Sequence, residues 1–132
     1  MGELYPTCLD NNDRNRMCAV VGCGPGLGGS AAIKFAREGF AIAAFNRTPE
    51  TFAPKLKSRD ASAAKNAFAE ASKILGKIDV LVYNAGGGVF GKSIMDIEPN
   101  AFRDSFDVSC TGALLCTQAV IPGMLASRWS SC

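Results

Sequence analysis

The stretch MCAVVGCGPGLG, residues 17–28, decides the fold of this chain. Its first half, Met17–Gly22, is a short apolar run, which is typical of a parallel strand that is buried on both faces. A glycine-rich loop follows, and residues 30–38 (SAAIKFARE) then place apolar side chains at helical spacing up to Gly39. The stretch therefore predicts a strand, a glycine loop and a helix in this order.

Later segments extend this unit into a parallel sheet. Phe40–Phe45 (FAIAAF) predicts a second strand, and a strand–helix–strand connection of this kind is parallel and right-handed. Residues 60–75 predict an alanine-rich helix, and Ile78–Tyr83 (IDVLVY) predicts a third strand. Residues 101–126 predict a mostly helical segment in which Pro122 kinks or ends the helix. We therefore expect an α/β fold with about three core strands and flanking helices.

The composition excludes several functions. The 132 residues carry a net charge of +2 and are 48% hydrophobic, which is ordinary for a globular domain and leaves no basic surface for nucleic acid. Histidine is absent, so Ser-His-Asp catalysis, Cys-His catalysis and histidine-containing zinc sites are excluded. We expect neither a nucleic-acid partner nor a metal site.

The six cysteines are expected to be reduced thiols of a cytoplasmic protein. Residues 1–16 are polar and lack the apolar core of a secretory signal, and no C-x-x-C pair occurs in the chain. Val108–Ser127 has no charged residue over twenty positions, but it contains Gln118 and Pro122, which suit a membrane span poorly. We expect this segment to be buried in a core or a subunit interface, without membrane contact.

The glycines after the first strand fit a phosphate-binding loop. The pattern G-x-G-x-x-G fails because its third glycine position falls on Leu27, whereas G-x-x-x-G-x-G fits at Gly22, Gly26 and Gly28. The first glycine permits a tight turn, and the second lets the backbone approach a pyrophosphate. The third lets the helix pack on the strand while its N-terminal N–H groups face the phosphates. A plain glycine-rich turn of an α/β domain is the alternative interpretation.

The end of the second strand bears on the choice of cofactor. A dinucleotide fold presents there the residue that contacts the adenosine ribose, and an acidic residue suits the 2′-hydroxyl of NAD. This chain has Asn46 and Arg47 at that place, with no acidic residue before Glu50. Since a guanidinium binds a 2′-phosphate that a carboxylate would repel, Arg47 favours NADP(H) over NAD(H). A solvated loop arginine is the alternative.

Together, the glycine loop and residues 79–86 (DVLVYNAG) resemble the short-chain dehydrogenase/reductase family. That family carries Thr-Gly-x-x-x-Gly-x-Gly and Asn-Asn-Ala-Gly in these places, and here Val21 replaces the threonine and Tyr83 the first asparagine. The resemblance covers residues 17–126 and implies an incomplete Rossmann-like parallel sheet. Residues 1–16 are then a flexible lead-in, and residues 17–132 form a partial dinucleotide-binding domain.

The resemblance also implies which residues contact a bound nicotinamide dinucleotide. They are Gly22, Gly26, Leu27 and Gly28 at the pyrophosphate, Arg47 at the 2′-phosphate, and Asn84, Ala85 and Gly86 in the adenosine-side cleft.

The family's catalytic groups find no match in this sequence. Family members transfer hydride between a carbonyl and an alcohol with an asparagine on a long helix, a serine, and a Tyr-x-x-x-Lys pair. Here Ser109 occupies the asparagine position, and neither Tyr5 nor Tyr83 has a lysine four residues later. The sequence ends at Cys132, before the fifth strand of the family fold. We therefore expect a truncated cofactor-binding half with no catalytic residues, inactive as an isolated chain.

Two other interpretations remain open. A non-catalytic truncated product would act only by associating with a second copy or a full-length relative through the helix at residues 101–126. Alternatively, Gly86–Ser93 matches the phosphate-binding pattern G-x-x-x-x-G-K-S of P-loop NTPases, in which Lys92 would reach the β- and γ-phosphates and Ser93 would bind Mg²⁺. Pro99 weighs against the second because it limits the helix that such a loop needs.

Overall fold

A three-stranded parallel sheet forms the centre of the chain, in a computed structural model that describes residues 16–46, 61–86 and 91–129. The strands are β1 (Met17–Val21), β2 (Ala41–Phe45) and β3 (Ile78–Tyr83), in the order β2-β1-β3. Both pairings are parallel, with Val21 opposite Phe45 on one side and Tyr83 on the other. The predicted α/β fold with three core strands is confirmed.

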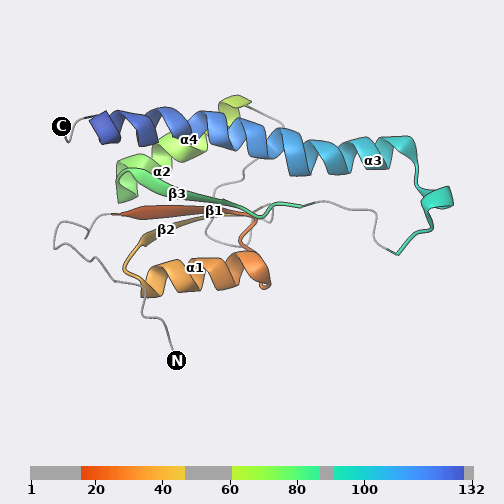
Figure 1. Cartoon of the computed structure of the whole chain (residues 1–132), viewed down its shortest axis with the longest axis horizontal. Coiled ribbons are helices and arrows are strands. Elements are labelled where there is room, and N and C mark those ends of the chain that lie inside the picture. The colour runs from red at the N-terminus through yellow and green to blue at the C-terminus, as the bar shows by residue number, and fades with distance from the viewer. Residues whose placement is uncertain (1–15, 47–60, 87–90, 130–132) are drawn as a thin grey trace.

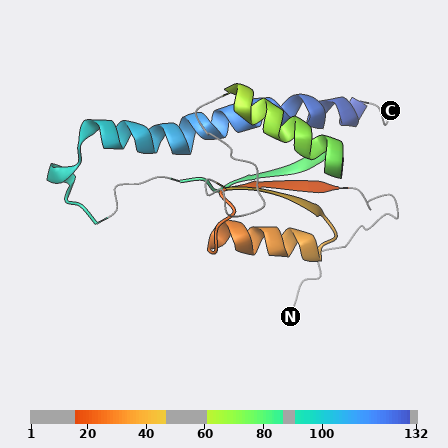
Figure 2. The ribbon, with the colours of Figure 1, turned by 180° about the vertical axis from the view of Figure 1, so that it is seen from behind.

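Helices cover both faces of this sheet (Figure 1). The α-helices are α1 (Leu27–Arg37), α2 (Ala61–Leu75), α3 (Pro99–Phe106) and α4 (Gly112–Trp129). Helix α1 lies on one face, while α2 and α4 lie together on the other, as the view from behind also shows (Figure 2). Between α3 and α4, residues Asp107–Thr111 form a π-helical turn, called the π turn below, so the three segments make one continuous helix.

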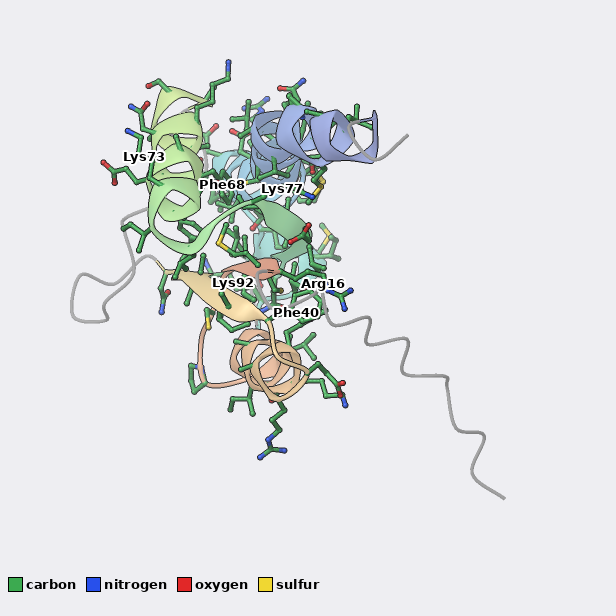
Figure 3. The ribbon with its side chains drawn as sticks, turned by 90° about the vertical axis from the view of Figure 1, so that its left-hand side faces the viewer. Arg16, Phe40, Phe68, Lys73, Lys77 and Lys92 are labelled. Atoms are coloured by element: carbon green, nitrogen blue, oxygen red, sulfur yellow. The ribbon has the colours of Figure 1, made fainter. Side chains whose placement is uncertain are left out.

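The core lies between the sheet and the pair α2–α4. All five residues of β1 are buried, as expected for a central parallel strand. Phe45 of β2 and Phe68 of α2 meet edge to face with ring centroids 4.9 Å apart, a favoured aromatic geometry. Figure 3 shows Phe68 in the layer between α2, α4 and the sheet. Cys116 and Val120 of α4 complete this cluster, which fixes α4 above the sheet.

The amino edge of the sheet is held by polar contacts. The backbone N–H of Met17 donates to a carboxylate oxygen of Asp79 at 3.0 Å, and the same carboxylate forms an ion pair with Lys77 at 2.9 Å. The guanidinium of Arg16 lies 4.9 Å from the ring centre of Phe40, and the two are close together in Figure 3. In open parallel α/β sheets, ligands bind at the opposite edge, outside the carboxyl ends of the strands.

Two expectations about helices need correction. Helix α1 begins at Leu27, three residues before the expected start, because its first turn is built from the glycines of the loop. Of the two alternatives expected at Pro122, a kink or an end, the end is wrong, because helix α4 continues to Trp129. A proline forfeits one backbone hydrogen bond, and packing of Val120 and Met124 on the core on either side of Pro122 offsets that loss.

The long apolar helix is mostly not buried within the described part of the chain. Residues 99–126 form a helix that is long and apolar enough to cross a membrane by length and composition, and 17% of an apolar 18-residue stretch within it is buried. The side chains of Leu114, Ile121 and Leu125 are exposed. Core burial is therefore limited to one face of this helix, which carries Cys116 and Val120, and burial of the rest in a subunit interface stays a prediction.

Candidate functional site

The glycine loop between β1 and α1 lies at the carboxyl edge of the sheet and is anchored to β2. The backbone N–H groups of Gly22 and Cys23 both donate to the carbonyl of Phe45, at 2.9 and 3.2 Å. The side-chain amide of Asn46 donates to the carbonyl of Cys23 at 3.3 Å. The loop therefore has a defined shape, set by the end of the neighbouring strand.

The segment after β3 crosses the glycine loop at close range. A Cβ atom on Gly22 would lie 2.5 Å from the backbone nitrogen of Ala85, and Gly22 has a φ of +82°. The backbone N–H of Asn84 donates to the carbonyl of Val21 at 2.8 Å, and its side-chain amide donates to the carbonyl of Gly22 at 3.1 Å. The structure thus brings together Gly22, Asn84 and Ala85, which the sequence assigned to one site from two distant motifs.

Helix α1 begins immediately beside this crossing point. Gly28 is buried, and a Cβ atom there would overlap the carbonyl oxygen of Gly22 and come within 3.0 Å of the Asn84 amide nitrogen. Gly29 has a similar constraint, because a Cβ atom there would lie 2.5 Å from the carbonyl oxygen of Gly24, which accepts the Gly29 N–H at 2.9 Å. Sequence reasoning gave Gly29 no role, although its place in the glycine cluster was the available signal.

The N-terminus of α1 is open toward solvent. Gly26 is the N-cap residue, no side chain caps the helix, and the first turn has no acidic residue. A Cβ atom on Gly26 would meet no protein atom within 4 Å, and Leu27 is 75% exposed. Backbone N–H groups and the positive end of the helix dipole therefore face an accessible space, an arrangement that suits a phosphate group.

Of the remaining predicted cofactor contacts, the structure describes Gly86 but not Arg47. Gly86 is exposed beside the crossing segment, with no protein atom within 4 Å of its Cβ position. Arg47 lies outside the described residues, so its contact with a 2′-phosphate stays a prediction.

Ser109, at the position of the family asparagine, is exposed within the π turn. The turn contacts the end of β3 through Tyr83, whose hydroxyl donates to the carbonyl of Val108. Burial raises the pKa of Tyr83 to about 12, with smaller contributions from Cys116 and Cys110. Sequence reasoning missed this contact, because helical spacing does not distinguish an α-turn from a π turn. The replacement of the family asparagine by Tyr83 was the available signal.

The P-loop interpretation lacks the helix that it requires. Lys92 and Ser93 are exposed, and the Ser93 hydroxyl accepts the backbone N–H of Met95 at 3.3 Å, capping a short 3-10 helix at Ile94–Asp96. The next α-helix begins only at Pro99. Within residues 91–98, therefore, no α-helix follows the lysine to direct N–H groups at a phosphate.

Comparisons with known proteins agree with this geometry. The family model described as short chain dehydrogenase matches residues 16–131. Meso-2,3-butanediol dehydrogenase of Serratia marcescens is 26% identical over 127 residues, which cover 86% of this chain and 50% of that protein. A short chain dehydrogenase of Aspergillus terreus is 30% identical over 142 residues, covering 93% of this chain and 30% of that protein.

Two solved structures are similar in fold. The ligand-free aldohexose dehydrogenase of Thermoplasma acidophilum matches with a TM-score of 0.75 and 26% identity, over 86% of this chain and 46% of that one. Carveol dehydrogenase of Mycobacterium avium, solved in complex with NAD, matches with a TM-score of 0.75 and 24% identity, over 87% of this chain and 51% of that one. The chain spans about half the length of the curated relatives that it matches first.

Proposed function

Because the chain belongs to the short chain dehydrogenase family, we propose that it binds a nicotinamide dinucleotide, NADP(H) in preference to NAD(H), at the carboxyl ends of β1 and β3. The observation that carries the proposal is the open N-terminus of α1. Its first turn has no side-chain cap, and the Cβ position of Gly26 has no protein atom within 4 Å. A pyrophosphate fits such a position, since it accepts hydrogen bonds from backbone N–H groups and is attracted by the helix dipole.

In this proposal the two motifs have different tasks. Gly26 and Leu27 present backbone to the pyrophosphate, while Gly22 and Gly28 allow the close packing that holds the loop and helix in place. The segment from Asn84 through Ala85 to Gly86 lines the cleft beside the glycine loop, on the adenosine side by resemblance to the family. The cofactor, when bound, would supply or accept a hydride, which is the family's chemistry.

The preference for NADP(H) rests on residues at the end of β2. Asn46 is uncharged and is hydrogen-bonded to the glycine loop, and Arg47 follows it in the sequence. Neither residue repels a 2′-phosphate as an acidic side chain would, and a guanidinium binds that phosphate with paired hydrogen bonds.

Calorimetric titration with NADPH and NADH tests both parts of the proposal. We expect micromolar binding of NADPH and weaker binding of NADH, and Arg47→Asp should reverse this order. Arg37→Asp, which makes the same charge change at an exposed position near the other end of α1, serves as the control and should leave the order unchanged. A folded chain that binds neither dinucleotide would contradict the proposal.

For these 132 residues we propose cofactor binding without turnover. Neither tyrosine of the sequence is followed by a lysine four residues later, so the proton relay of the family reaction has no source among them. Mixing the purified chain with NADPH and simple ketones should produce no loss of the reduced nicotinamide absorbance. Steady oxidation of NADPH that depends on the ketone would contradict this part of the proposal.

A second candidate function is association through the helix at residues 101–126, with another copy or a full-length relative. The observation that favours it is the exposed apolar surface of this helix, including Leu114, Ile121 and Leu125. Sedimentation velocity should show association that Leu114→Lys reduces, because a charge there is costly to bury. A monomer at all concentrations would exclude self-association.

A further inference from the structure

The end of β3 is attached to two parts of the candidate site at once. Tyr83, the last residue of β3, donates its hydroxyl to the carbonyl of Val108 in the π turn. The next residue, Asn84, donates a hydrogen bond from its backbone N–H to the carbonyl of Val21 and another from its side-chain amide to the carbonyl of Gly22. Two adjacent residues therefore join the glycine loop on one side to the long helix on the other.

The π turn makes the Val108 carbonyl available to Tyr83. In an α-helix the N–H of Gly112 would donate to the carbonyl four residues earlier, which is that of Val108. Here the Gly112 N–H donates to the carbonyl of Asp107, five residues earlier. The Asp107 carboxylate accepts a hydrogen bond from the Thr111 hydroxyl at 3.1 Å. The π turn is therefore stabilised by this internal hydrogen bond as well as by the one from Tyr83. Such turns recur at functional sites in helices.

The π turn contacts the end of β3, the outer strand on the side of the sheet opposite to β2. The sheet order β2-β1-β3 places the glycine loop between the two outer strands, and the long helix passes above the carboxyl ends of the strands (Figure 1). A dinucleotide bound at the carboxyl ends of the strands, with its adenosine between β2 and the segment after β3, extends its nicotinamide half past that segment toward the long helix. The π turn lies within the length of one tyrosine side chain of that strand end.

We propose that Tyr83 is a positioning residue, which holds the Val108 carbonyl and thereby keeps the π turn and its Ser109 beside the nicotinamide half of the bound dinucleotide. This inference rests on the proposed function. The hydroxyl is a donor at physiological pH, as in any tyrosine, and burial raises its pKa further, to about 12.

The test compares two ligands that share the adenosine half. NADPH carries the nicotinamide, whereas adenosine 2′,5′-bisphosphate lacks it. Tyr83→Phe removes only the hydroxyl and should weaken NADPH binding roughly tenfold, the effect of one hydrogen bond, with the affinity for the bisphosphate unchanged. Tyr5→Phe, the same change at the other tyrosine of the chain, should alter neither affinity.

A double-mutant cycle separates positioning from a general loss of structure. If Tyr83 acts through the turn that bears Ser109, then Ser109→Ala should weaken NADPH binding in the unaltered chain but have little further effect beside Tyr83→Phe. Additive effects of the two substitutions would overturn the inference. Equal weakening of both ligands by Tyr83→Phe, or no weakening of NADPH binding, would do the same.

Hydrogen exchange on the unaltered chain gives a second measurement that needs no variant to fold. NADPH should slow amide exchange in Asp107–Gly112, and the bisphosphate should not. Equal protection by both ligands, or protection by neither while both bind, would overturn the positioning role of Tyr83 but leave the proposed cofactor binding intact. If neither ligand binds the unaltered chain, the proposed function fails, and this inference fails with it.

Discussion

Replacing Gly22 by alanine should lower the free energy of unfolding by about 3 kcal/mol. Two costs add at this position. The φ of +82° lies in the left-handed region, where an alanine costs roughly 1–2 kcal/mol. The new Cβ atom would also lie 2.5 to 2.8 Å from three backbone atoms of Asn84 and Ala85, and overpacking of this kind costs typically 1–3 kcal/mol.

Backbone atoms on both sides make this cost hard to relieve. A shift of the segment after β3 would strain the bonds from Asn84 to Val21 and Gly22, at 2.8 and 3.1 Å. Gly26→Ala is the matched control, because it adds the same methyl group four residues further along the same loop with no protein atom within 4 Å. It should destabilise the chain much less than Gly22→Ala, with a cost limited to replacing glycine by alanine at the N-cap of α1, and should weaken NADPH binding, since its methyl group would enter the space proposed for the pyrophosphate.

Urea denaturation followed by circular dichroism measures both variants. We expect the Gly22→Ala midpoint to fall with an unchanged slope, and a thermal midpoint lower by roughly 10 °C, at about 4 °C per kcal/mol for a domain near this size. A Gly22→Ala chain that loses less than about 1 kcal/mol would refute the close approach of the two motifs, because the strain and overlap terms each predict at least that much.

Three further predictions follow from the same region. The phenol of Tyr83 should titrate near pH 12 in the folded chain, which the ultraviolet absorbance of the phenolate measures when the titration of Tyr83→Phe is subtracted. Because the pKa of this phenol is near 10 in the unfolded chain, the free energy of unfolding should fall as the pH rises from 10 to 12. Burial raises the pKa of the Cys18 and Cys116 thiols to about 11, so both should react with iodoacetamide more slowly than exposed Cys110, as peptide mass mapping would reveal, and equal rates would contradict their burial. Asn84→Ala should cost about 1 kcal/mol in urea denaturation, because it removes the side-chain hydrogen bond to the glycine loop; an unchanged midpoint would show that the bond contributes nothing.

The sequence by itself determined the sheet and most of the glycine loop. The first two strands are contiguous apolar runs, and the third, apolar except for Asp79, was predicted at its observed bounds, Ile78–Tyr83. Such runs are local signals, because a parallel strand buried by helices on both faces needs apolar side chains at nearly every position. The requirement for glycine at Gly22 and Gly28 was likewise predicted from spacing between a strand and a helix, although their contact with a cofactor stays a proposal.

Only the tertiary structure decided how distant segments constrain one another. The overlap at Gly22 depends on Ala85, more than sixty residues away, whereas the need for glycine at Gly29 depends on the shape of the loop that brings the Gly24 carbonyl close. The continuation of α4 past Pro122 depends on packing against the core, which outweighs a local helix-breaking preference. The contact between Gly22 and Ala85 exists only after the crossover brings β3 beside β1, so no local spacing or composition encodes it. The hydrogen bond from the Tyr83 hydroxyl to the π turn also depends on the tertiary structure, because it joins the end of a strand to a helix. The spacing of apolar residues along that helix does not reveal the π turn.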